Sequence, residues 1–201
     1  MSICVRLRAN YCSVNNYEYI IASLPVPDKN EPLDAAALVE EIRSHLSDYD
    51  NSLMDLLLGG FDIDALDEEF YKKALKSRNA FIREYFLWDL RVRNTKTKYL
   101  NTKLGRTTGM DVIDLPGALE FDAYRDVRAI LMSSDILQRE RDLDSLMWDK
   151  CDELTMMHNF DVDVILSFTA KLMIADRWNK LDPATGRELF RSLVEEIRKT
   201  R

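Results

Sequence analysis

The sequence predicts an all-α protein, an elongated bundle of about eight helices. Apolar side chains recur at spacings of three and four residues along most of the 201-residue chain. Capping residues precede several of these runs, and glycine or proline follows them. Strand-like segments do not alternate with helical ones, so no βαβ unit is indicated. We expect one domain over residues 1–201, or two helical sub-bundles, about 14–106 and 117–201, joined by the 105–117 loop.

The N-terminal part of the chain contains one ambiguous segment and one clear helix. Residues 16–24 end before Pro25, which favours a short helix, although the alternation of Tyr17 and Tyr19 also suits a strand. The proline-rich segment SLPVPDKNEP then predicts a loop. After it, Asp34 is placed to cap an amphipathic helix. Its apolar face carries Leu38, Ile42 and Leu46.

The middle of the chain predicts three further helices. A short helix over about 50–58 ends at a Gly-Gly pair, and a second follows over 67–78. A long helix then runs from about 78 to 104 and stops at Gly105. Its apolar seam repeats at spacings of four and three, which predicts packing along its whole length. The seam residues are Phe81, Tyr85, Trp88, Val92, Thr95 and Tyr99.

The last part of the chain predicts a loop over 107–117 and four more helices. They fall near 118–132, 141–158, 161–178 and 183–199. In the third of these helices, near 161–178, apolar residues share one face. That face carries Ile165, Phe168, Leu172 and Ala175.

Composition excludes several classes of protein. The formal net charge is −7, which argues against a protein that coats nucleic acid. Cys4, Cys12 and Cys151 form no CxxC pair, so neither a disulfide framework nor a structural zinc site is indicated. Arg6 and Arg8 interrupt what would be the apolar region of a signal peptide, and no segment is long and apolar enough to span a membrane. We expect a cytoplasmic protein.

The motifs of common catalytic sites are absent from the sequence. No Gly-rich phosphate loop and no GxSxG motif occur, and His45 and His158 are expected to be surface or helix-end residues. Two acidic runs could supply metal ligands. They contain Asp62 and Asp64, and Asp161 and Asp163. The first fails as an EF-hand loop, and helix capping explains both runs better. We therefore predict no catalytic, cofactor or metal site.

The charges are unevenly distributed along the chain. Residues 78–106 carry eight Lys or Arg against two acidic residues, whereas residues 135–163 carry nine Asp or Glu against three basic ones. The two segments could therefore pack against each other within the chain. Alternatively, the basic helix could dock an acidic partner. Nucleic acid is the least favoured ligand, because the aromatic side chains lie on the packing seam rather than on a stacking surface.

Three segments resemble a small bacterial family of uncharacterised proteins associated with V-type ATPases. They read NYEYIIASLP, FLWDLRVRNTKTKYLNTKLG and FDVDVILSFTAKLMIADRWNKLDPATGRELFRSLVEEIR. That family is similar to the C subunit of the rotary enzyme, which is the d subunit in eukaryotes. The resemblance implies a helical, non-catalytic subunit or accessory that couples or docks to the central stalk and rotor ring. This chain is shorter than a typical C subunit, so its seat in the complex could differ.

The resemblance also implies candidate contact residues and a location. The partner-contact candidates are Arg91, Arg93, Asn94, Lys96, Lys98, Lys171 and Arg177. For Asn94, a hydrogen bond to a neighbouring helix is favoured over partner contact. The protein would be cytoplasmic and peripheral to a membrane complex, with no cofactor. The alternatives are a helical adaptor unrelated to ATPases and an enzyme that binds a metal through the four aspartates above.

Overall fold

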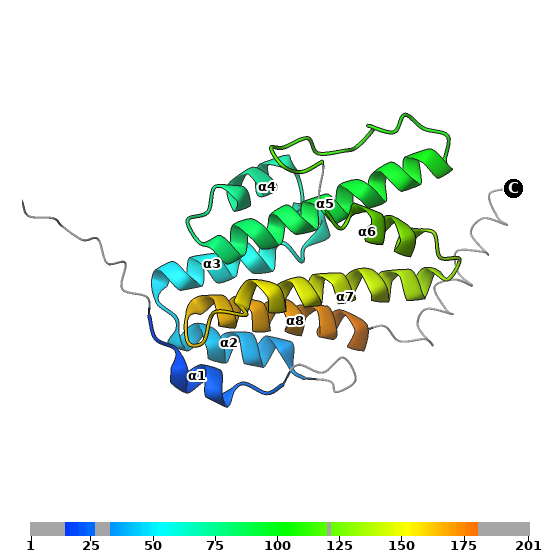
Figure 1. Ribbon diagram of the computed structural model, residues 1–201. Helices are drawn as coiled ribbons and strands as arrows, with labels where there is room; N and C mark the ends of the chain where they lie inside the picture. The colour runs from blue at the N-terminus through cyan, green and yellow to red at the C-terminus, as the bar shows by residue number, and fades with distance from the viewer. Residues whose placement is uncertain (1–14, 27–32, 120–121, 181–201) are drawn as a thin grey trace, which may run out of the picture.

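The computed structural model describes residues 15–26, 33–119 and 122–180. These residues form helices and contain no strand, which confirms the predicted all-α class (Figure 1). The helices are α1 (Glu18–Ser23), α2 (Ala35–His45), α3 (Asp48–Gly59), η1 (Ile63–Ala65), α4 (Glu68–Leu75), α5 (Ala80–Lys103), α6 (Tyr124–Leu131), α7 (Ile136–Thr155) and α8 (Val162–Asn179). Within the described ranges, no helix is long and apolar enough to cross a bilayer.

Helix α8 organises the bundle. The run from Ile165 to Ala170 is buried without a break, as expected for a helix that is covered on all sides. Helix α8 contacts α7 as well as α2 and α3, and α5 contacts α4, α6 and α7. Helices from the N-terminal and C-terminal halves of the chain therefore pack directly on one another. Figure 1 shows α5, α7 and α8 running side by side along the length of the molecule.

Two apolar clusters form the core, and α3 and α8 contribute to both. The larger cluster takes Leu57 from α3 and Leu166 from α8 and extends under α5. The smaller takes Met54 and Ile165 from the same two helices and lies under α1 and α2. The helix expected at 16–24 is present as α1, and its Ile20 is buried in the smaller cluster. A helix rather than a strand forms here because its apolar face packs on the bundle.

The long helix α5 forms where the sequence predicts it. The side chain of Asn79 caps it by accepting a hydrogen bond from the Ile82 amide at 2.8 Å. The predicted seam lies against the core, with Phe81 and Tyr85 stacked and their ring centroids 5.7 Å apart. The predicted Gly-Gly stop is also confirmed, because α3 ends at Gly59 and Gly60 caps it. A Cβ at Gly60 would lie 2.3 Å from Phe86 of α5, so glycine permits this close approach.

Two asparagines of α5 hold the loop that follows it. Asn94 donates to the Ile113 carbonyl at 2.8 Å and accepts from the Ile113 amide at 3.1 Å. Asn101 donates to the Met110 carbonyl at 2.6 Å. The two residues are seven apart and lie on one face of the helix, so the loop returns along α5. The loop predicted over 107–117 is confirmed.

Two predicted boundaries were wrong. Helix α6 begins at Tyr124 rather than near 118, because the preceding backbone is held to α5 through Asn94. Helix α7 begins at Ile136 rather than 141, with Asp135 accepting from the Gln138 amide at 3.0 Å. The first apolar residues of α7 are exposed, so this turn carries no periodic signal. The helix predicted over 183–199 lies outside the described residues.

Candidate functional site

The basic residues in the middle of α5 have partners within the chain. Arg93 pairs with Asp89 through Nε at 2.7 Å, and the Tyr71 hydroxyl donates to the same carboxylate at 2.6 Å. Lys96 donates to both carboxylate oxygens of Glu140 in α7, at 2.6 and 2.9 Å. The basic segment and the acidic segment therefore meet inside the molecule. Packing of the basic segment against the acidic segment, the first of the two alternatives predicted from the charge pattern, is therefore present in the fold.

Arg91 and Asn94 bind the loop that follows α5 instead of a neighbouring helix. Arg91 Nε donates to the Gly117 carbonyl at 2.7 Å. Asn94 is buried, and its amide is satisfied by the backbone of Ile113 and Ala118. The expectation that Asn94 is satisfied within the chain is correct, but its partner is loop backbone. An asparagine is tolerated inside this helix because both ends of its amide are paired.

The two candidates on α8 pair with α7. Lys171 binds Asp152, and its Nζ lies 5.3 Å from the ring centroid of Trp148. Arg177 binds Asp144, which is buried and also accepts from the indole of Trp178 at 2.7 Å. These contacts fix α8 against α7 at two levels along their length. Whether these residues also contact a partner stays a prediction.

Lys98 differs from the other candidates. Among the described residues it has no ion pair and no side-chain hydrogen bond. It is half-buried and lines a groove between α5 and α6. Within the part of the chain that the structure describes, Lys98 is therefore the basic partner-contact candidate whose side chain has no partner.

Burial sets the protonation of several core groups. The pKa of the Tyr71 hydroxyl is raised by burial and by the nearby Asp89 carboxylate. Burial likewise raises the pKa of Tyr85. Burial raises the pKa of the Cys151 thiol to about 12, so at neutral pH it is a protonated thiol and a poor nucleophile. These groups are part of the core packing.

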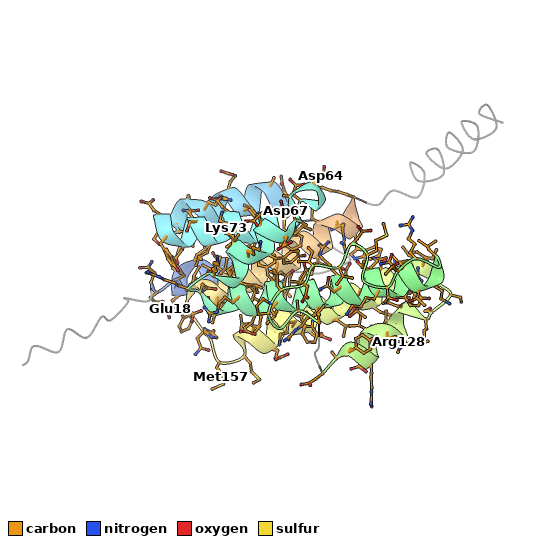
Figure 2. All side chains as sticks on the ribbon, turned by 90° about the horizontal axis from the view of Figure 1, so that it is seen from above. Glu18, Asp64, Asp67, Lys73, Arg128 and Met157 are labelled. Atoms are coloured by element: carbon orange, nitrogen blue, oxygen red, sulfur yellow. The ribbon has the colours of Figure 1, made fainter. Side chains whose placement is uncertain are left out.

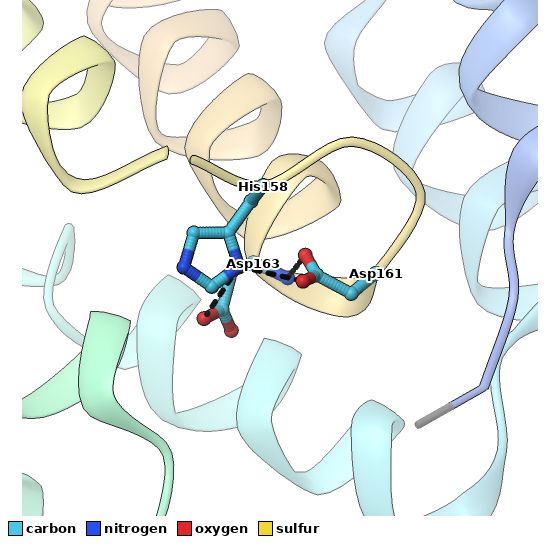
Figure 3. A group of neighbouring side chains, drawn as sticks. All are labelled: His158, Asp161 and Asp163. Atoms are coloured by element: carbon cyan, nitrogen blue, oxygen red, sulfur yellow. Dashed lines mark hydrogen bonds and ion pairs between the residues drawn. The ribbon is translucent and has the colours of Figure 1, made fainter. Parts of the chain in front are cut away.

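A second polar cluster lies at the turn between α7 and α8 (Figure 3). His158 Nδ1 lies 2.6 Å from a carboxylate oxygen of Asp161 and 3.7 Å from one of Asp163. The donor atoms of these residues all lie within 4.8 Å of one another, a spacing that a divalent ion could use. Two of the aspartates considered as metal ligands are thus adjacent, but the cluster does not include Asp62 or Asp64.

Hydrogen bonds within the chain account for this cluster. Asp161 caps α8 by accepting from the Asp163 amide at 3.2 Å, and Asn79 donates to the Asp163 carboxylate. The hydrogen bond to Asp161 raises the pKa of His158, and burial raises the pKa of Asp163. The cluster therefore joins the first turn of α8 to the first turn of α5. The capping role predicted for Asp161 is correct.

A neighbouring network holds the N-terminal residues. The buried Asp50 carboxylate accepts hydrogen bonds from Asn15 at 2.8 Å, from the Tyr17 hydroxyl and from the Ser47 hydroxyl at 2.8 Å. The Tyr17 amide donates to the Phe160 carbonyl at 2.7 Å. Ser47 is the cap of α3 and Asp50 its third residue, a Ser-x-x-acid pattern that marks a helix start. Using this signal would have placed the start of α3 correctly.

The fold defines an all-α bundle whose long helices pack on apolar clusters and are joined by ion pairs. Compared with protein-family models, residues 62–201 match "Protein of unknown function (DUF2764)". The match covers more than half of the chain, and the protein belongs to this family. Neither the search of curated proteins nor the search of solved structures gave a match.

Proposed function

We propose that the protein is a non-catalytic structural or accessory subunit of a V-type ATPase or ATP synthase. It would dock to the central stalk or the rotor ring and lie in the cytoplasm, peripheral to the membrane complex. The proposal draws on the resemblance of three sequence segments to a V-type ATPase-associated family. These segments supply α1, the C-terminal three-quarters of α5, and α8.

One observation carries the proposal: the polar residues of the resembling segments hold the long helices together. Lys96 joins α5 to α7. Lys171 and Arg177 join α8 to α7. Asn94 fixes the loop that follows α5. These polar positions of the resembling segments therefore stiffen the body, as expected of a part that transmits force.

The dimensions of the bundle suit such a part. Helix α5 has 24 residues, which corresponds to a length of ~36 Å. Helices α7 and α8 have 20 and 18 residues and pack against each other, and α7 also packs on α5. Close-packed interiors have low compressibility and transmit strain. A load applied at one end of these helices would reach the other with little loss.

Purification from the native host tests the proposal. A tagged full-length copy should elute together with ATPase subunits after mild detergent extraction of the membranes. Reproducible elution without any ATPase subunit would contradict it. Elution with another defined complex would instead favour a helical adaptor unrelated to ATPases.

A matched pair of variants separates docking from folding. Arg91→Glu with Arg93→Glu removes two internal contacts of α5, whereas Lys73→Glu with Arg78→Glu changes the charge equally at exposed positions. If Arg91 and Arg93 serve contacts within the chain, their double variant lowers the melting temperature and the control double variant does not. If α5 also docks a partner, a fraction of the first variant that remains folded fails to co-elute.

A further inference from the structure

A groove of about 600 Å³ lies between the C-terminal half of α5 and one face of α6. On α5 its lining residues follow helical spacing and include Lys98 and Tyr99. On α6 they recur at every fourth position, with Tyr124, Arg128 and Met132. The groove is therefore formed mainly by the facing sides of two helices, and Thr108 of the loop after α5 also lines it.

Three cations line this groove without a carboxylate partner. They are Lys98, Lys103 and Arg128, and no described carboxylate lies within ion-pair distance of any of them. Lys103 instead lies 5.5 Å from the ring centroid of Tyr99. This differs from the neighbouring Lys96, which is paired with Glu140. Mutual repulsion of unpaired cations is relieved when an anion binds between them.

The other lining groups also suit an anion. No carboxylate of the described residues lines the groove. Tyr99, Tyr124 and Thr108 also line it, and their hydroxyls make no hydrogen bond within the described chain. Cations together with hydroxyl donors are the groups that bind phosphate oxygens.

Exposed apolar side chains belong to elements at the same end of the molecule as the groove, and one of them, Met132, lines it. Leu104, Met132 and Ile136 are between 63% and 66% exposed. They belong to the end of α5, the end of α6 and the start of α7, which Figure 1 shows gathered at one end of the bundle. Leu137 is also exposed there. Large apolar side chains grouped on a surface indicate an interaction site.

We propose that this groove binds the phosphate headgroup of an anionic phospholipid, with these exposed apolar side chains entering the membrane interface. The arrangement of the two kinds of residue favours a lipid. An amphipathic peptide helix inserts its apolar face into an apolar groove, whereas three cations line this groove and the exposed Leu104 and Ile136 lie outside its lining. An anionic lipid has a charged headgroup, which the cations of the groove can bind, next to apolar chains, which the exposed apolar side chains can contact. This inference goes beyond the proposed ATPase role and does not depend on it.

Vesicle binding by the isolated full-length chain tests the inference. The chain is mixed with vesicles of phosphatidylcholine alone, or of equal parts phosphatidylcholine and phosphatidylglycerol, and the bound fraction is measured by sedimentation. Binding is expected to the vesicles that contain phosphatidylglycerol and to fall as salt is added, because salt screens the attraction. Absence of binding to these vesicles at low salt would overturn the inference.

Two variants with equal charge change locate the site. Lys98→Gln with Arg128→Gln is expected to lower the partition onto phosphatidylglycerol vesicles by roughly 10- to 30-fold. Lys73→Gln with Arg78→Gln, at exposed positions outside the groove, is expected to lower it by much less. Leu104→Gln with Met132→Gln tests the apolar contribution and is expected to lower partition severalfold. Equal losses in the groove variant and its control would contradict the groove as the site.

Further measurements distinguish other occupants. Inorganic pyrophosphate is titrated into the chain by calorimetry, and binding of pyrophosphate without vesicle binding would point to a soluble phosphate and overturn the lipid assignment. A third outcome combines two measurements: the wild-type chain does not bind vesicles, and Lys98→Gln with Arg128→Gln abolishes co-elution with ATPase subunits. In that case the groove binds an acidic protein segment instead of a lipid. Each of these results leaves the proposed ATPase role to be judged by the purification of the wild-type chain.

Discussion

The two ends of the bundle differ in whether their polar side chains have partners within the chain. At the turn end, around the α7–α8 connection and the starts of α3, α5 and α8, two buried carboxylates are paired: Asp50 accepts three side-chain donors and Asp163 accepts from Asn79. At the groove end, over residues 95–103 and 124–137, Lys98 and Arg128 have no carboxylate partner among the described residues. Met157 and Arg128, both labelled in Figure 2, mark the two ends.

The difference shows where polar residues contribute to stability. A buried polar group that lacks a partner costs free energy, so the hydrogen bonds of Asp50 and Asp163 contribute to the stability of the turn end. The cations of the groove end remain partly or fully exposed to water, which tolerates them unpaired. We therefore expect substitutions at the turn end to change folding and those at the groove end to change binding. Four predictions test this contrast.

The largest effect is expected at Asp50. Asp50→Ala leaves the Tyr17 and Ser47 hydroxyls without their acceptor and should lower the free energy of unfolding by about 2–4 kcal/mol. Asp48→Ala, an exposed change in the same turn, is the control and should cost under about 1 kcal/mol. Urea denaturation measures both. Equal costs for the two variants would refute the importance of the buried network.

Asn79 should come next, because it serves two partners. Asn79→Ala removes the cap of α5 and the donor to Asp163, and should cost about 1–3 kcal/mol. Asn79→Ser keeps a capping oxygen but cannot place the second donor, so it should recover part of the loss. Thermal unfolding of both variants measures the two roles. Full recovery by serine would show that Asp163 does not need this donor.

The His158 cluster should give a smaller, pH-dependent effect. Hydrogen bonding to Asp161 raises the pKa of His158 in the folded state above its unfolded value. Its contribution is therefore complete below about pH 6.5 and is lost as pH rises through the raised pKa. Because the pair is partly exposed, the free-energy difference between wild type and His158→Gln should be about 0.5–1 kcal/mol in acid. Unfolding curves across this range should show the difference shrinking with pH, and a difference that grew would disprove the pairing.

The smallest effect on stability is expected in the groove. Lys98→Gln with Arg128→Gln should change the free energy of unfolding by no more than about 0.5 kcal/mol, because no internal pair is lost. Lys96→Gln breaks the contact with Glu140 and should cost slightly more, up to about 1 kcal/mol. Parallel denaturant titrations compare the two. A larger loss in the groove variant would mean that its cations stabilise the fold.

Local signals in the sequence predicted much of the fold. Asp34 and Asp161 are predicted correctly as helix starts, because a cap depends on residues within one turn. The seam of α5 and the face of α8 that carries Ile165 and Leu172 are also correct. Periodicity reports these faces because burial recurs once per helical turn. Where exposed residues begin a helix, as in α7, the same signal fails.

The candidate site was less accessible to prediction. The sequence predicts His158 as a surface or helix-end residue and misses its place beside Asp161 and Asp163, although the turn brings the three together within six residues. Asn79 and Asn101 carry no signal beyond capping or loop propensity. Their partners Asp163 and Met110 are reached because the start of α8 lies beside the Asn79 cap of α5 and because the loop returns along α5. Such contacts depend on the relative positions of elements, which spacing along the chain does not encode.

By itself, the sequence determined that this protein is a bundle of helices with a long, basic α5 and an apolar face on α8. Only the tertiary structure decided which of the charges on α5 are neutralised. Lys96 faces Glu140 because α7 packs beside it, whereas Lys98, two residues later, turns toward α6 and meets no described carboxylate. The reason is physical: helical periodicity fixes the direction in which a side chain points, but the element that covers that direction is set by packing between distant segments.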